Sequence, residues 1–114
     1  MNYSSIQSAA DVTRTVSVKI DALFPGVDIK VAAATDAGNG DGTIGSAGAG
    51  TLTLTTSDQT LITGIGSCYT VTGASNGHNL TYTMAGATTG AASYADFTSV
   101  SQSVVTVTYT LSDN

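Results

Sequence analysis

Hydrophobic and polar residues alternate along several short stretches of this 114-residue chain. Residues 10–22 read "ADVTRTVSVKIDA", in which every second residue is predominantly aliphatic and the residues between are mainly Thr, Ser and Lys. One face of this stretch carries the aliphatic residues Val12, Val16, Val18 and Ile20, and Arg14 interrupts it. A period of two predicts a half-buried β-strand, because successive side chains of a strand point to opposite faces.

The C-terminal stretch "SVVTVTYTL" repeats this alternation. One of its faces carries Val105, Val107, Tyr109 and Leu111, and the other carries Val104 and three threonines. Long edge strands with little charge are normally avoided, because their unpaired backbone can pair with other chains. The two terminal strands therefore indicate pairing between subunits.

Turn sequences rich in Gly, Asn, Asp and Ser separate the stretches that we expect to be strands. No window has a helical period. The expected strands are residues 11–21, 27–34, 50–56, 59–65, 67–72, 78–84, 96–100 and 102–112. This spacing predicts an all-β fold, an immunoglobulin-like β-sandwich of seven to eight short strands, with a small barrel or jelly roll as the alternative.

The chain is long enough for one domain. We expect a polar N-terminal arm at residues 1–10 and a single β-sandwich domain at residues 11–114. Within it, the strand at residues 11–21 either completes its own sheet or is donated to a neighbour, so that strand exchange between subunits completes the fold.

The charge and polarity of the chain argue against some classes of function. The chain has three Lys and Arg residues against eight acidic residues, which gives a net charge of −5. Nucleic-acid binding is not expected, because phosphate contacts need a basic patch. Membrane insertion is not expected either, because no apolar run approaches ~20 residues. Low charge and abundant Ser, Thr and Gly are typical of an extracellular surface or a virion.

The segment "NGDGTI" resembles the core of a calcium-binding loop, which places oxygen ligands at alternate positions around a turn-forming Gly. The ligands would be Asp36, Asn39, Asp41 and the Thr43 carbonyl. The competing interpretation is a loop whose Asn-Gly and Asp-Gly pairs form turns. We favour the loop, because a calcium site generally needs more carboxylates, and we expect no cofactor.

Catalytic chemistry has little support in the sequence. Cys68 and His78 are the only thiol and imidazole, and a Cys/His pair supports nucleophilic catalysis only when an acid orients the histidine. Free Cys more often behaves as a small buried hydrophobe. The aromatic residues could form a sugar-binding platform, but core or interface packing is the favoured use. These residues are Tyr69, Tyr82, Tyr94, Tyr109 and Phe97.

The segments "TRTVSVKIDA" and "SVVTVTYTL" resemble the terminal strands of chaperone–usher fimbrial subunits, particularly the alpha-type colonization-factor pilins. In that family the N-terminal extension completes the incomplete immunoglobulin-like fold of the adjacent subunit. The resemblance implies that Val12, Val16, Val18 and Ile20 fill the pockets of a neighbour and that the C-terminal strand flanks the acceptor groove. It also implies an assembly chaperone as a partner.

Together these features favour a structural subunit, not an enzyme, that self-assembles into an extracellular filament by β-strand addition between its copies. Two alternatives stay open. One is a phage or virion structural protein, such as a capsid decoration or tail subunit. The other is a secreted β-sandwich module that binds carbohydrate or calcium.

Overall fold

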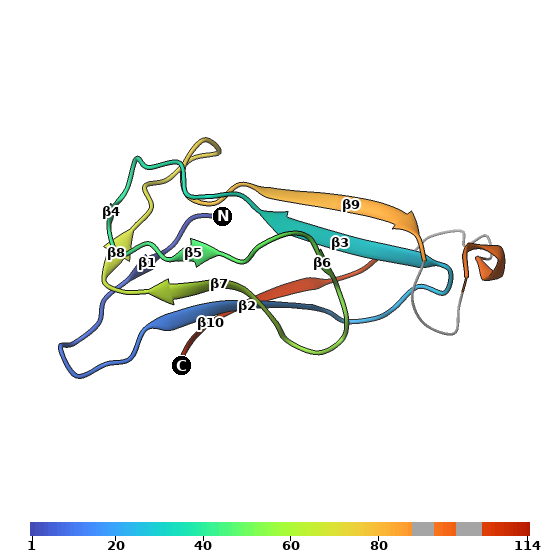
Figure 1. Cartoon of the computed structure of the whole chain (residues 1–114), viewed down its shortest axis with the longest axis horizontal. Coiled ribbons are helices and arrows are strands. Elements are labelled where there is room, and N and C mark those ends of the chain that lie inside the picture. The colour runs from blue at the N-terminus through green and yellow to red at the C-terminus, as the bar shows by residue number, and fades with distance from the viewer. Residues whose placement is uncertain (88–92, 98–103) are drawn as a thin grey trace.

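The computed structural model describes residues 1–87, 93–97 and 104–114. These residues form ten strands in three antiparallel sheets, so the all-β prediction is confirmed, and the arrangement agrees with a β-sandwich (Figure 1). No helix in this described part is long and apolar enough to cross a membrane. The elements are β1 (Ser4–Ser5), β2 (Arg14–Ile20), β3 (Val27–Ala33), β4 (Asp41–Gly42), β5 (Ser46–Ala47), β6 (Leu52–Thr53), β7 (Gln59–Ile65), β8 (Cys68–Tyr69), β9 (Leu80–Gly86), the 3₁₀ turn η1 (Tyr94–Asp96) and β10 (Val107–Asp113).

The largest sheet has the strand order β10-β2-β7-β5. β2 lies in its interior and pairs antiparallel with β10 on one side and with β7 on the other. The alternating residues Val16, Val18 and Ile20 are each at most 3% exposed. In the single chain, the N-terminal alternating stretch therefore supplies an inner strand of its own sheet.

A second sheet, of order β6-β3-β9, packs on the first. Among the described residues, the core between the two sheets contains eight buried hydrophobic residues: Val16, Val18, Ile20, Val31, Leu54, Leu61, Ile62 and Ile65. Three of the eight come from β2, so this strand is a main source of apolar burial, the dominant stabilising term in folding.

A small third sheet, β1-β8-β4, attaches the N-terminal arm to its own chain. Ser4 pairs with Tyr69 and Ser5 with Cys68. The Tyr3 N–H also donates a hydrogen bond of 2.9 Å to Oγ1 of Thr70. The sequence did not indicate this sheet, because backbone pairing of small polar residues leaves no hydrophobic alternation.

The strand predicted at residues 50–56 is wrong in its extent, because only β6, the two residues at its middle, forms a strand. After β6 the chain crosses between the sheets. The Leu54 N–H donates to a carbonyl of β3, whereas the Thr55 carbonyl accepts from an N–H of β2. A segment that bonds to two sheets in succession cannot continue one ladder, although its sequence alternates.

Two other predicted strands also differ. The strand at residues 67–72 stops at β8, because Val71 has a φ of 64°, a left-handed conformation that is incompatible with an extended strand. The stretch 96–100 begins in η1, and its residues 98–100 lie outside the described part. The strand expected at 59–65 matches β7 at both ends. The strands expected at 11–21, 27–34, 78–84 and 102–112 correspond to β2, β3, β9 and β10 with shifted ends, and residues 102–103 lie outside the described part.

Gly45 permits a close backbone approach at the start of β5. Its φ is 94°, and a Cβ atom built there would lie 2.7 Å from both the Ile65 Cγ1 and the Thr63 carbonyl oxygen. We expect Gly45→Ala to lower the free energy of unfolding by roughly 2–5 kcal/mol, from left-handed strain and overpacking together. Gly50→Ala is the control, because Gly50 has a φ of 86° but no atom within 4 Å of its Cβ position. Urea denaturation of the two variants separates the steric contribution from the left-handed strain that both share. Equal losses of unfolding free energy in the two variants would contradict a steric contribution at Gly45.

Candidate assembly interface

The strands β9 and β10 are the terminal strands of their sheets on one side of the sandwich. In the described part of the chain, one row of backbone groups on each has no strand partner. The registers identify which side chains face inward, since directly paired residues share a face. Tyr82 pairs with the fully buried Val31, and Tyr109 pairs with the fully buried Val18. Both tyrosines therefore lie on the core-facing side.

Several core-facing side chains on this side are nevertheless exposed. Met84 pairs with Ile29 next to the core and is 75% exposed, and Tyr82 is 48% exposed. Leu111 pairs with the buried Val16 and is 41% exposed. We call this side of the sandwich the open flank: the free edges of β9 and β10 with the exposed side chains of Tyr82, Met84 and Leu111.

The opposite side of the sandwich is closed. There the chain itself crosses from β6 to β7, and Leu54 fills the space between the sheets with 2% exposure. The terminal strands on that side, β5 and β6, are only two residues long. In the part of the chain that the structure describes, only the open flank therefore combines two seven-residue edges with exposed core-facing side chains.

One side-chain contact bridges the two edges of the open flank. The hydroxyl groups of Tyr82 on β9 and Tyr109 on β10 are hydrogen-bonded to each other. Burial, followed by the bond from Tyr82, raises the pKa of the Tyr109 hydroxyl, so this group stays protonated at neutral pH. A side-chain hydrogen bond thus spans the gap between the sheets at the middle of the flank.

The open flank is almost uncharged. β9 has no charged residue, and the only one in β10 is Asp113. The Asp113 carboxylate accepts a bond of 2.7 Å from Nε of Arg14. The Asp113 side chain is 67% exposed and that of Arg14 is partly exposed, so the contribution of the pair to stability is small, but the pair neutralises the carboxylate. The net charge of −5 is therefore carried by other surfaces.

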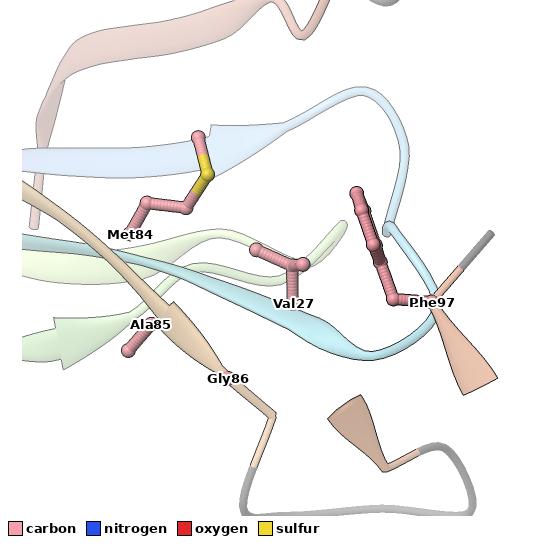
Figure 2. Close-up of a pocket in the computed structure, with 5 residues that line it drawn as sticks. All are labelled: Val27, Met84, Ala85, Gly86 and Phe97. Atoms are coloured by element: carbon pink, nitrogen blue, oxygen red, sulfur yellow. The ribbon is translucent and has the colours of Figure 1, made fainter. Parts of the chain in front are cut away.

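A hollow of about 320 Å³ lies at one end of the open flank, where β9 ends (Figure 2). Its lining is mainly apolar: Val27, Met84, Ala85, Gly86 and Phe97. Figure 2 shows the Met84 side chain and the Phe97 ring on either side of Val27. The apolar surface of the flank thus continues to the end of the molecule.

The predicted assembly strand is only partly a strand. Val12 precedes β2 and is 52% exposed, whereas Val16, Val18 and Ile20 are buried. Nη1 of Arg14 donates to the Ser5 hydroxyl at 2.9 Å and thereby joins β2 to the N-terminal arm. On the C-terminal strand, Val105, Val107 and Tyr109 pack against the core and Leu111 is exposed.

The predicted calcium ligands take part in hydrogen bonds within the loop and with more distant parts of the chain. Oδ2 of Asp36 accepts the Gly38 N–H at 2.8 Å, and Oδ1 of Asp41 accepts its neighbour's N–H at the same distance. The Asn39 amide donates to the Asn76 side chain, and the Thr43 carbonyl accepts from Gly66. In the described residues no three His, Cys, Asp or Glu side chains gather into a possible metal site.

The candidate thiol and imidazole have structural surroundings. The His78 ring is fully buried, its Nδ1 bonds to the Ala34 carbonyl at 2.8 Å, and it stacks on Tyr3 with 6.0 Å between ring centroids. Cys68 lies in β8, and burial raises the pKa of its thiol, which disfavours the reactive thiolate. The stacking of Tyr3 on His78 and the pairing of Ser5 with Cys68 attach the N-terminal arm to the domain.

No family model, curated protein or solved structure matches the chain. The open flank itself is therefore the main guide to function. Sequence reasoning found its β10 half but missed the contribution of β9. A signal was present, since Leu80, Tyr82 and Met84 alternate with Thr and Ala, but alternation does not tell which strand lies at an edge.

Proposed function

We propose that this protein is a structural subunit that self-assembles into an extracellular filament by β-strand addition between neighbouring copies. The observation that carries the proposal is the open flank. Its edges are seven residues long and carry no Pro and no Lys, which are the residues that commonly protect edge strands against pairing. A neighbour on this surface would extend the backbone ladders and cover the exposed apolar side chains.

The free energy gained by burying apolar side chains at this contact is sufficient for a specific association. Full burial of a side chain of this size contributes ~1.5–3 kcal/mol, and Tyr82, Met84 and Leu111 are already partly covered. Their burial by a neighbour therefore contributes a few kcal/mol, to which the new backbone hydrogen bonds add. Ordering on association offsets part of this gain, although edges that are already regular lose little freedom.

A filament also needs a second contact on every subunit. Exchange of the N-terminal segment with β2, the role expected for the strand at residues 11–21, would supply it. A neighbour's β2 between β10 and β7 would reproduce the contacts that β2 makes within one chain, as in domain swapping. The connection from β2 to β3, residues 21–26, is the hinge on which such an exchange would turn.

The proposal is tested by placing a charge on the open flank. We expect the wild-type mass to rise with concentration, and the separate variants Met84→Lys and Leu111→Lys to stay monomeric at tenfold higher concentration, since an unpaired ammonium group is costly to bury. Ile6→Lys is the matched control: Ile6 is 85% exposed but lies in the connection between β1 and β2. Light scattering gives the mass, and thermal melting verifies that each monomer is folded. Wild-type protein that stays monomeric, or lysine variants that assemble normally, would overturn the proposal.

A further inference from the structure

We infer that the occupant of the open flank is the same flank of a second copy, related by a two-fold axis perpendicular to the sheets. In this arrangement β10 pairs antiparallel with β10 of the partner, β9 pairs with β9, and each sheet doubles its number of strands. The inference rests on the proposed self-assembly and specifies one of its contacts.

The tyrosine bridge favours this arrangement over a single inserted strand. A strand placed between β9 and β10 would have to separate the hydroxyl groups of Tyr82 and Tyr109, which are in direct contact. A flank-to-flank contact leaves the bridge intact and encloses it together with Met84 and Leu111. The occupant must therefore extend both sheets side by side.

Such an occupant must present two strand edges that are as far apart as the two sheets. The opposite flank has edges of only two residues, β5 and β6, which cannot match strands of seven residues. The open flank of another copy matches in length and in spacing. Self-pairing brings the residues at the two-fold axis next to their own symmetry mates, so an uncharged centre of the edge is needed. The one acidic side chain of β10, Asp113, lies at the end of the strand and is paired with Arg14.

The area of the flank is adequate for a pair. Seven residues at ~3.4 Å each and sheets ~10 Å apart, with outer side chains added, give roughly 500 Å² on each copy. The resulting total of roughly 1,000 Å² reaches the lower limit for a specific protein–protein contact.

Cysteine cross-linking distinguishes this geometry from others. In a Cys68→Ser background, single cysteines replace Thr108, Thr110 and Ser112 on the exposed outer face of β10, and Thr83 on that of β9. We expect at least one β10 variant, and Thr83→Cys, to give covalent homodimers with a short bis-maleimide in at least tenfold higher yield than Thr60→Cys. Thr60 is exposed on the outer face of the same sheet but lies on β7, two strands from the β10 edge.

The outcomes separate the inference from the proposed function. Self-linking of β10 and of β9, without links between Thr83→Cys and Thr110→Cys chains in a mixture, supports the two-fold pair. Two outcomes would overturn the two-fold pair but leave self-assembly supported. In the first, the protein assembles but the β9 and β10 cysteines cross-link to themselves no more than the Thr60→Cys control. In the second, β9 of one copy cross-links to β10 of another. Wild-type protein that remains monomeric overturns the proposed function and the pair together.

Discussion

A chain that lacks residues 1–20 is expected to lose its cooperative fold, and a synthetic peptide of residues 10–22 is expected to restore it. The deletion removes Val16, Val18 and Ile20 from the core and leaves β10 and β7 without the strand between them. Burial of three aliphatic side chains contributes about 5–9 kcal/mol. That loss is comparable with the whole stability of a typical domain, about 5–15 kcal/mol.

Restoration by the peptide follows from the position of β2. The strand joins the rest of the sheet by backbone hydrogen bonds and by alternate side chains that enter the core, the two elements of strand addition. Arg14 in the peptide would also pair again with Asp113. Circular dichroism and thermal melting of the truncated chain, with and without peptide, measure the effect.

The control is the same peptide with Val18→Asp. Val18 is fully buried at the centre of β2, so a carboxylate there would lie unpaired in the core. If the wild-type peptide restores folding and the Val18→Asp peptide does not, strand addition by β2 is supported. If neither peptide restores a melting transition, β2 acts only within its own chain, and the second contact of the proposed filament would have to lie elsewhere.

The strands with regular alternation could be predicted from the sequence, because burial of one face imposes a period of two. This is why β2, β3, β7, β9 and β10 were expected close to their observed positions. The strands β1, β4 and β5 were not expected. Each is two residues long and consists of Ser, Ala, Asp or Gly. Backbone pairing alone therefore holds these strands in place, and the sequence has no apolar pattern that predicts them.

The candidate site was only half predictable, for a related reason. Alternation shows that Tyr109 and Leu111 share a face, but the order of strands in a sheet depends on contacts distant in sequence. The exposure of Met84 arises because β9 is the terminal strand of its sheet, with no further described strand beside it. Arg14 illustrates the same limit: its position suggested a core-facing charge, whereas its partner Asp113 lies at the other end of the chain.

The second large effect expected concerns Leu54 and Met84, two core-facing residues on opposite flanks. Leu54 is 2% exposed and Met84 is 75% exposed. In dilute protein, Leu54→Ala should lower the free energy of unfolding by about 2–5 kcal/mol, because it leaves a cavity on the closed side. Met84→Ala should change it by less than about 0.5 kcal/mol, since the side chain lies mainly in solvent.

At concentrations where the wild type assembles, the effects of Leu54→Ala and Met84→Ala should differ less. Met84 would then be buried against a neighbour, and its truncation should weaken association by about 1–3 kcal/mol, or roughly 5- to 150-fold. Urea denaturation in dilute solution and sedimentation over a concentration series measure the two quantities. An association constant unchanged by Met84→Ala would show that a neighbour leaves the flank exposed. A stability loss in dilute protein as large as that of Leu54→Ala would instead show that the flank is already closed in the monomer, since the cost of truncation follows burial.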